Sequence, residues 1–379
     1  MPVVGPTAQA APMVADMNAL IDTQTLRACI QKVATGPEYS KDLSYEETLD
    51  AMRSILSGTA DPVQTAIFFI SLRMKRETDA ENKGVVQGII DKTFRVEAPV
   101  DELVDIADPY DGFIKGLPSA PFLPAVLAAC GVAAISHGLE SVGPKHGVTH
   151  RQILRCAGIN VDLTPIEAAM RLGISELGWA YIDQQQYCPP LHDLVGIRQR
   201  IVKRQVLTTV EKLIRPICGQ QKTHLLTGYV HKAYPPMYAE LARFAGFDSA
   251  LIVRGAEGGV TPSLQQAAKV FSFQNRGTEQ LIEIDPKSLG IHQTTRSTPI
   301  PQLADDADKP SSASLAELAA EAGLVALNGQ TGPSYDSLVY TGALTLAHLR
   351  RYDSLQAAAD AVRSVLNSGA ALAHFQAGR

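Results

Sequence analysis

The spacing of apolar residues predicts helices over the first quarter of the chain. Between residues 22 and 92 the apolar positions recur at helical intervals, and three places carry the residue types that begin a helix. Two have the composition of a capping box, and the third places an N-cap before a proline at the first helical position. These are Ser44 with Glu47, Thr78 with Glu81, and Asp61 with Pro62. We therefore expect a small helical domain.

After Ala98 the pattern changes to short apolar runs that alternate with helical stretches. This alternation is typical of an α/β fold with a mostly parallel sheet flanked by helices. The runs are Leu103–Ile106, Val132–Ile135, His224–Thr227 and Leu251–Val253. A further helix is expected from Thr164, and residues 297–313, rich in Pro, Asp and Ser, are expected to form a surface loop.

These patterns divide the chain of 379 residues into three parts. We expect a disordered arm at 1–19, a helical domain at 20–97 and an α/β domain at 98–379, with part of 165–200 packing on the helical domain. The composition, 45% hydrophobic and 19% charged, is that of a soluble globular protein, and no apolar run approaches the roughly 20 residues that span a bilayer. The first residues lack the basic start of a signal peptide, so we expect a cytoplasmic protein without a membrane partner.

The five cysteines are scattered, odd in number and without C-x-x-C spacing. This arrangement favours buried small side chains over a disulfide framework or a metal site, so no metal ligands are predicted. The sequence also has no Walker loop, no Gly-x-Ser-x-Gly elbow and no H-E-x-x-H motif. NTPase, serine hydrolase and zinc peptidase activities are therefore not expected.

Two segments of the helical region carry a resemblance to a known family. Leu56–Gln64 reads LSGTADPVQ and Ser71–Thr78 reads SLRMKRET. They are similar to the LSGEASPAQ and ALRMKGET runs of glycosyltransferase family 3, which includes anthranilate phosphoribosyltransferase and the pyrimidine nucleoside phosphorylases. The resemblance covers nearly the whole chain after residue 20. It implies the nucleoside phosphorylase/phosphoribosyltransferase type of fold and a homodimer formed through the helical domain.

The motifs that carry the family's chemistry are altered. The GTGGD loop, which holds pyrophosphate on backbone N–H groups, falls at Asp108–Gly112 and reads DPYDG. The DGLDE turn, whose acidic pair binds Mg²⁺, falls at Glu257–Thr261 and reads EGGVT. The KHGNRS segment falls at Ser136–Ser141 and keeps His137, Gly138 and Ser141. The resemblance therefore implies loss of the usual phosphoribosyl transfer, although Arg198 matches the arginine that faces the aromatic acid.

A side branch of the family is more similar. Arg204–Pro216 resembles the R…TLAKLLNP run, and Arg254–Gly259 resembles the RGTEGE run, of phosphoribosyltransferase-like proteins that lack transferase activity. One bacterial member of that branch binds DNA without sequence preference. The resemblance therefore implies a protein with degenerate active-site motifs that binds nucleic acid.

A basic stretch supports this implication. Between residues 194 and 232 there are eight Lys and Arg residues against a single acidic one, while the whole chain has a net charge of −5. Such a stretch is a possible footprint for nucleic-acid phosphates, and the alternative is an ordinary solvated helix face. The predicted nucleic-acid residues are Arg200, Lys203, Arg204, Lys212 and Arg215.

Two loops that follow predicted strands are the predicted binding site for a phosphate-bearing ligand, because ligands of parallel α/β sheets bind beyond the carboxyl ends of the strands. The predicted residues are His137, Gly138, Ser141, Lys145, Gly147, Arg198, Arg254 and Gly255. The alternative for His137 is a structural role, a hydrogen bond at the end of the strand. The alternative for the glycines near Arg254 is a tight turn between a strand and a helix.

Three functions remain open at this point. The first is a protein without phosphoribosyl transfer that binds nucleic acid, DNA or RNA, or another phosphate-bearing ligand. The second is an active pentosyl- or phosphoribosyltransferase on an unidentified acceptor, which alone would require Mg²⁺ and phosphoribosyl pyrophosphate. The third is a regulatory or scaffolding homodimer.

Overall fold

The computed structural model describes residues 24–301 and 310–379. The arm expected at 1–19 and most of the central part of the loop expected at 297–313 lie outside these residues. Among the described residues, no helix combines the length and apolar character needed to cross a membrane.

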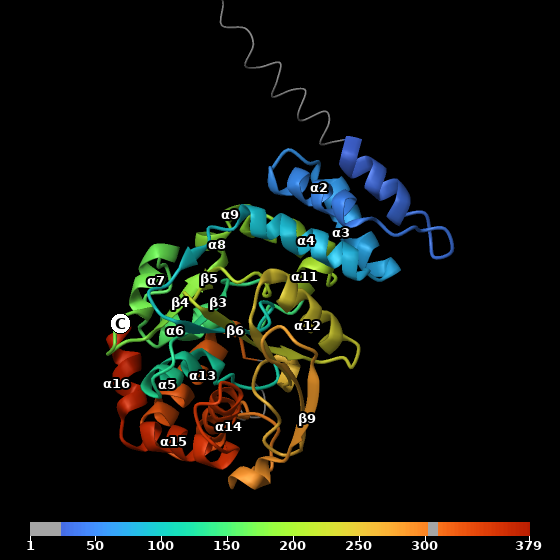
Figure 1. Cartoon of the computed structure of the whole chain (residues 1–379). Helices are drawn as coiled ribbons and strands as arrows, with labels where there is room; N and C mark the ends of the chain where they lie inside the picture. The colour runs from blue at the N-terminus through green and yellow to red at the C-terminus, as the bar shows by residue number, and fades with distance from the viewer. Residues whose placement is uncertain (1–23, 302–309) are drawn as a thin grey trace, which may run out of the picture.

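The N-terminal part is a helical bundle, drawn in blue at the top of Figure 1. It contains a helix at 24–33, α2 (Tyr45–Leu56), α3 (Pro62–Lys75) and α4 (Asp79–Lys92). Both predicted capping boxes form: the side-chain oxygens of Ser44 and Thr78 accept hydrogen bonds from the N–H groups three residues later, at 3.1 and 3.3 Å. The Asp61 side chain caps the start of α3. These local start signals are confirmed.

The second part is built on a seven-stranded sheet in the order β4-β3-β2-β6-β7-β8-β9. The strands from β4 to β7 in this order are parallel to one another. Strand β8 pairs antiparallel with β7, and β9 pairs antiparallel with β8. Their bounds are β2 (Glu102–Ala107), β3 (Ala134–Gly138), β4 (Trp179–Asp183), β6 (Lys222–Tyr229), β7 (Ser249–Arg254), β8 (Ala268–Phe273) and β9 (Gln280–Ile284). A separate parallel pair joins β1 (Val96–Glu97) to β5 (Ile217–Cys218). The predicted α/β fold with a mostly parallel sheet is confirmed.

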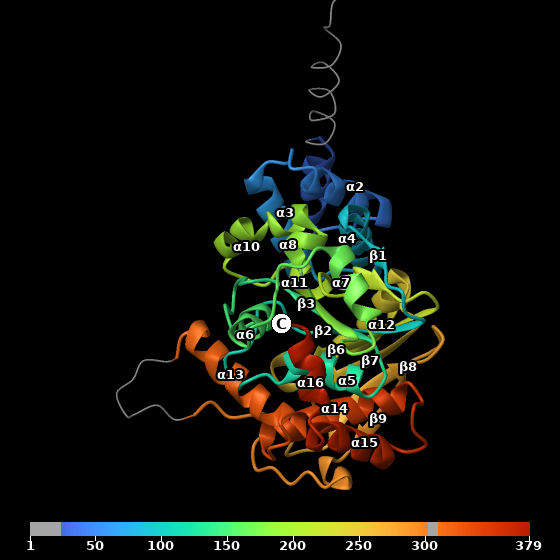
Figure 2. The same ribbon diagram turned by 90° about the vertical axis from the view of Figure 1, so that its left-hand side faces the viewer.

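Helices cover both faces of the sheet (Figures 1 and 2). Along β2, Val104 and Ile106 pack in the core formed with α5 and the C-terminal helices, whereas Leu103 and Ala107 pack in the core shared with the helical bundle and α12. This alternation follows from the two-residue period of a strand. The helices are α5 (Leu123–Ala129), α6 (His150–Cys156), α7 (Pro165–Leu172), α8 (Gln184–Tyr187), α9 (Pro189–His192), α10 (Val195–Ile201), α11 (Val206–Val210), α12 (Tyr234–Ala245), α13 (Ser312–Leu327), α14 (Pro333–His348), α15 (Leu355–Asn367) and α16 (Ala370–Ala377), with 3₁₀ turns η1 (Ala120–Phe122), η2 (Ala256–Gly258) and η3 (Pro286–Leu289).

The strand order places the site. The chain passes from β2 to β3 and β4 on one side and then returns to β6 and β7 on the other side of β2. The loops that follow β2, β3, β6 and β7 therefore all leave the sheet at the carboxyl ends of its parallel strands. They span residues 108–119, 139–149, 230–233 and 255–261. A crevice at such a reversal of strand order is the usual ligand site of open α/β sheets.

Candidate functional site

Asp108 joins the loop after β2 to the elements that follow β3 and β7. Its Oδ2 lies 2.8 Å from Nε2 of His150, the first residue of α6, and its Oδ1 accepts a hydrogen bond of 2.8 Å from the N–H of Val260. The side chain is only 2% exposed. Both carboxylate oxygens are thus taken up by the protein's own groups.

Tyr110 anchors the same loop in the interior. Its hydroxyl lies 2.5 Å from Nδ1 of His137 and 2.6 Å from the hydroxyl of Tyr187, and Nε2 of His137 lies 2.6 Å from Oδ1 of Asp105. A carboxylate can only accept, so Nε2 donates to Asp105 and, in the neutral ring, Nδ1 accepts from Tyr110. Burial raises the pKa of the Tyr110 hydroxyl well above its ordinary value, with a further contribution from Tyr187. The tyrosine therefore stays protonated and fixes the loop.

Asp111 and Glu257 pair with two of the cationic groups near the strand ends, Arg204 and Lys145. Asp111 pairs with Arg204 at 2.8 Å and with Lys145 at 3.5 Å. Glu257 accepts hydrogen bonds from the backbone N–H groups of Ile114, at 3.1 Å, and Lys115, at 2.7 Å, and its other oxygen lies 3.4 Å from Lys145 Nζ. Glu257 thus acts as an internal anion, held where backbone N–H groups converge.

The loops that these carboxylates join are closely packed. Gly112 has a φ of 75°, and a Cβ atom there would lie 2.4 Å from the carbonyl oxygen of Gly147. The neighbouring Phe113 exchanges two backbone hydrogen bonds with Val148, at 3.0 and 2.9 Å. Only a glycine permits both the left-handed backbone and this approach.

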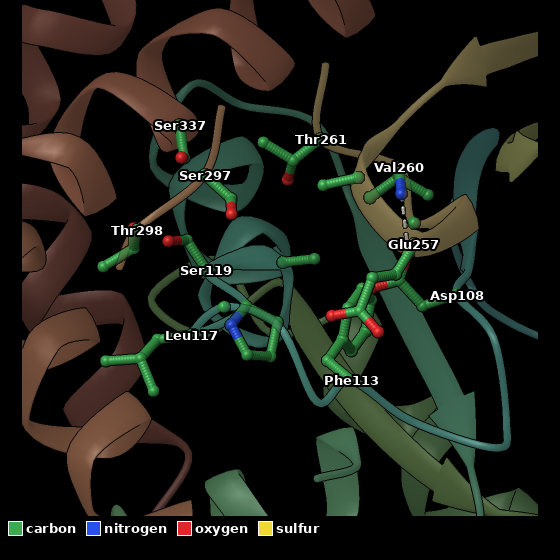
Figure 3. A pocket seen from close by; sticks show the side chains of 15 residues that line it. Asp108, Phe113, Leu117, Ser119, Glu257, Val260, Thr261, Ser297, Thr298 and Ser337 are labelled. Carbon is green, nitrogen blue, oxygen red and sulfur yellow. Dashed lines mark hydrogen bonds between the residues drawn. The ribbon is translucent and has the colours of Figure 1, made fainter. Parts of the chain in front are cut away.

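The space beside Asp108 is small, and its mostly apolar wall carries several hydroxyl groups. Figure 3 shows Ser119, Ser297, Thr298 and Ser337 around it, with Glu257 at its rim and the hydrogen bond between Asp108 and Val260 drawn as a dashed line. Its volume is about 30 Å³, which is room for one or two water molecules and too little for a phosphate group with its ligands.

A cavity of about 200 Å³ lies between the helical bundle and the carboxyl ends of β2 and β6. We call it the large cavity, in contrast to the small space beside Asp108. It combines cationic, hydroxyl and aromatic groups, a composition suited to an anionic ligand that carries a ring. Its polar and aromatic residues are Arg73, Tyr110, Asp111, Arg204, Thr208, Thr209, Lys212, Tyr229, His231, Tyr234, Tyr238 and Glu257. A neighbouring cavity of about 330 Å³ shares Val230 and Glu257 with it and adds Arg254 and Arg296.

The predicted ligand residues fall into three groups. His137, Lys145 and Gly147 surround the loop after β2, where Gly147 permits the contact with Phe113. Gly138 ends β3, and the hydroxyl of Ser141 lies 3.2 Å from Nδ1 of His146. Arg254 and Gly255 line the neighbouring cavity.

Arg198 lies apart from these groups. It is fully buried and forms a two-pronged pair with Glu211, with both N···O distances at 2.6 Å. Gln184 donates a further hydrogen bond to the same carboxylate. The guanidinium that matched a substrate-facing arginine is therefore already occupied by an internal carboxylate.

The predicted nucleic-acid residues do not share one exposed face, because Lys212 is buried and Arg215 is half-buried. Lys212 is 3% exposed and donates to the carbonyl oxygen of Gly228, and Arg215 is half-buried and bonded to the carbonyl oxygen of Gly246. Arg200, Lys203 and Arg204 are exposed, although Arg204 pairs with Asp111. The C-cap of helix α10 is Val202, which has a φ of 65°, so Arg200 lies on that helix whereas Lys203 and Arg204 follow it.

Residues of the large cavity were missed from the sequence. Arg73 lies on α3, and Tyr234 and Tyr238 lie on α12, outside both predicted loops of the sequence. Arg73 donates a hydrogen bond of 2.8 Å to the Tyr234 hydroxyl. The one available signal was the position of Arg73 inside the SLRMKRET segment.

The site does not fit the Mg²⁺ ion that the family resemblance implies. Val260 and Thr261 stand at the acidic positions, and the carboxylates of Asp108, Asp111 and Glu257 already bind internal donors. In the part of the chain that the structure describes, no group of three or more His, Cys, Asp or Glu side chains is arranged to hold a metal ion.

Comparison with known proteins decides the family. Residues 27–93 match the helical bundle domain of the glycosyl transferase family, and residues 121–372 match its a/b domain. The chain belongs to this glycosyl transferase family.

Among its relatives is an uncharacterized protein of Aquifex aeolicus, 29% identical over 70% of this chain and 78% of the relative. An anthranilate phosphoribosyltransferase of Nitrosomonas europaea is 26% identical over 89% of this chain and 93% of that enzyme.

Two solved structures show the same fold. Anthranilate phosphoribosyltransferase from Thermus thermophilus superposes with a TM-score of 0.72 at 19% identity, covering 93% of this chain and 97% of that one. The Saccharomyces cerevisiae enzyme in complex with PRPP and Mg superposes with a TM-score of 0.73 at 16% identity, covering 93% and 96%.

Proposed function

We propose that this member of the family does not transfer phosphoribosyl groups and binds a phosphate-bearing small molecule in the crevice between the helical bundle and the sheet. One observation carries the first half: Asp108, Asp111 and Glu257 occupy the N–H and cationic groups of the strand-end loops. An incoming pyrophosphate would meet these carboxylates as like charges and would have to displace them.

The loss of phosphate contacts has a large effect on a transferase. Such enzymes depend on donors preorganised around the developing charge, and removal of one donor typically costs about 3 kcal/mol of transition-state stabilisation. Here the backbone N–H groups of Ile114, Lys115 and Val260 all serve internal carboxylates. Together with the occupied Arg198, this opposes catalysis at the rate of an ordinary enzyme.

The second half of the proposal rests on the large cavity. Arg73, Lys212 and His231 supply positive or protonatable groups beside four tyrosines. A nucleotide has both a phosphate and a flat ring, so it matches this lining better than a purely apolar compound.

Two measurements test the proposal. We expect purified protein, supplied with anthranilate, phosphoribosyl pyrophosphate and Mg²⁺, to form no phosphoribosyl anthranilate, whereas calorimetry shows AMP binding in the same sample. Turnover on the order of 1 s⁻¹ or more would overturn the first half and favour an active transferase, the only alternative that requires Mg²⁺ and phosphoribosyl pyrophosphate. Absence of AMP binding would overturn the second half.

Nucleic acid is the second candidate ligand. It is favoured by the exposed Arg200 and Lys203, which have no ion-pair partner among the described residues. If four phosphates are engaged, the logarithm of the affinity for duplex DNA falls with log salt at a slope of about −3.6. Charge reversal at Arg200 and Lys203 should flatten that slope by about 2. Charge reversal at Lys222, exposed at the amino end of strand β6, should leave the slope unchanged. No binding at low salt would remove this candidate.

A homodimer is proposed on a separate observation. Helix α3 leaves Val63, Ile67 and Met74 exposed at 61, 39 and 77%. Exposed apolar side chains gathered on one helix are typical of an interaction surface. Sedimentation equilibrium should give twice the mass of the chain, and Ile67→Glu should shift it toward the monomer; a wild-type monomer at micromolar concentration would reject the dimer.

A further inference from the structure

Lys212, predicted from the sequence as a surface contact to nucleic acid, has a different position in the structure. It is 3% exposed and lines the large cavity. Its Nζ donates a hydrogen bond of 2.9 Å to the carbonyl oxygen of Gly228 and lies 5.0 Å from the ring centroid of Tyr238. Gly228 and Tyr238 also line the cavity, so the ammonium group lies at the cavity wall.

This ammonium group is incompletely satisfied. An ammonium has three N–H donors, and one hydrogen bond to a carbonyl and one aromatic ring are its contacts in the described residues. In that part of the chain Lys212 forms no ion pair, and the carboxylates of Asp108, Asp111 and Glu211 act on it only through space. A buried cation without a paired anion is costly.

The cavity offers a second unsatisfied group close by in the sequence. The hydroxyl oxygen of Thr208, four residues before Lys212, is buried without a hydrogen-bond partner in the described residues, and Thr208 lines the same cavity. A phosphate group accepts several hydrogen bonds and carries negative charge, so it satisfies an ammonium and a hydroxyl together.

The aromatic wall fits the remainder of a nucleotide. The ring centroids of Tyr234 and Tyr238 are 5.4 Å apart, and those of His231 and Tyr234 are 5.8 Å apart. The Tyr234 hydroxyl is held by Arg73. Such a row of rings at the edge of a cavity can stack on a base, whatever the base is.

We propose that Lys212 Nζ receives the phosphate group of a mononucleotide whose base packs against Tyr234 and His231. The inference rests on the proposed function, since it names the residue and the ligand class for the same crevice. Burial lowers the pKa of Lys212 to about 8, while the nearby Asp108, Asp111 and Glu211 oppose that shift. A bound phosphate would stabilise the protonated amine and thereby tighten its own binding below that pH.

The first test replaces the amine and keeps the volume. By calorimetry at pH 7.5 we expect Lys212→Met to bind AMP about 10- to 100-fold more weakly than wild type, the usual effect of losing a hydrogen bond to a charged group. Lys222→Met, the control at the exposed start of β6, should bind as wild type. Equal AMP binding by Lys212→Met and wild type would overturn this inference and leave the proposed function standing. Absence of AMP binding by wild type would overturn both.

The second test needs no variant and therefore applies even if Lys212→Met does not fold. Between pH 7 and 9.5 the phosphate of AMP, whose second pKa is about 6, is about nine-tenths or more ionised, so the amine dominates the linkage. We expect the affinity of wild type to be nearly constant below pH 8 and to fall about tenfold per pH unit above it. Adenosine should show no such fall, and inorganic phosphate should show it. A flat AMP profile would overturn the inference.

Other charged and titratable groups face this position. Lys145 acts on Lys212 through space, and Glu257, Arg73, Arg204, His231, Tyr110, Tyr234 and Tyr238 line the same cavity. Burial raises the pKa values of the Tyr110 and Tyr238 hydroxyls, which removes them from the pH window of the test. Persistence of the fall above pH 8 in a folded Lys212→Met variant would assign it to one of these neighbours and refute the role of Lys212.

Discussion

The buried pair of Arg198 and Glu211 makes the stability of this protein sensitive to a single substitution, Arg198→Met. Both side chains are at most 1% exposed, and both N···O distances are 2.6 Å. Removal of the arginine leaves the Glu211 carboxylate buried, with the Gln184 amide as its one side-chain donor among the described residues. Breaking a buried pair in this way typically costs about 3–5 kcal/mol.

Replacement of both partners should reverse most of the loss. The double variant Arg198→Met with Glu211→Met buries no unpaired charge, and such replacements are often neutral or stabilising. We expect the double variant to unfold at a higher urea concentration than Arg198→Met alone. If Arg198 were instead unpaired and available to a ligand in the crevice, Arg198→Met would leave no carboxylate unpaired and would not lower the free energy of unfolding in this way.

Urea unfolding measured by two signals provides the assay. The chain has one tryptophan, Trp179 on β4, which is buried and stacked on Phe375 at 5.2 Å. Its fluorescence reports the α/β part, and far-ultraviolet circular dichroism reports all helices, so coincident transitions justify a single free energy of unfolding. A loss below about 1 kcal/mol in Arg198→Met, or a double variant no more stable than the single one, would refute the reasoning.

Two further predictions concern other parts of the fold. His348 is hydrogen-bonded to Ser249, and burial lowers its pKa to about 3. Below about pH 6.5 the unfolded chain therefore binds one proton more than the folded chain, and the free energy of unfolding decreases as the pH is lowered. His348→Gln should reduce that slope by up to about 1.4 kcal/mol per pH unit between pH 6 and 4, measured by urea unfolding; an unchanged slope would contradict it. Gly112→Ala should lower the melting temperature far more than Gly131→Ala, because both glycines have a left-handed φ but only the first lacks space for a Cβ atom. Equal shifts would show that the contact with Gly147 can relax.

The sequence was sufficient for features that depend on near neighbours in the chain. A capping box needs two side chains three residues apart, so Ser44 with Glu47 and Thr78 with Glu81 could be read directly. The four predicted parallel strands are short apolar runs and are confirmed. The antiparallel strand β9 was missed because its residues are largely exposed and carry no apolar run.

The site depended on pairings that a linear reading cannot supply. Arg204 and Asp111 are 93 residues apart, and Glu257 and the Lys115 N–H group are 142 residues apart, yet both pairs close in the fold. A count of charges along 194–232 treats every lysine and arginine as exposed, whereas the structure buries Arg198 and Lys212.

The sequence by itself therefore determined the family's fold and the absence of its glycine-rich phosphate loop, because both follow from residue types at short spacing. Only the tertiary structure decided which carboxylate neutralises which cation, because ion pairing depends on distance in space and on the water that burial removes. That decision assigns Arg198 to an internal pair and leaves Lys212 as the buried cation at the cavity wall.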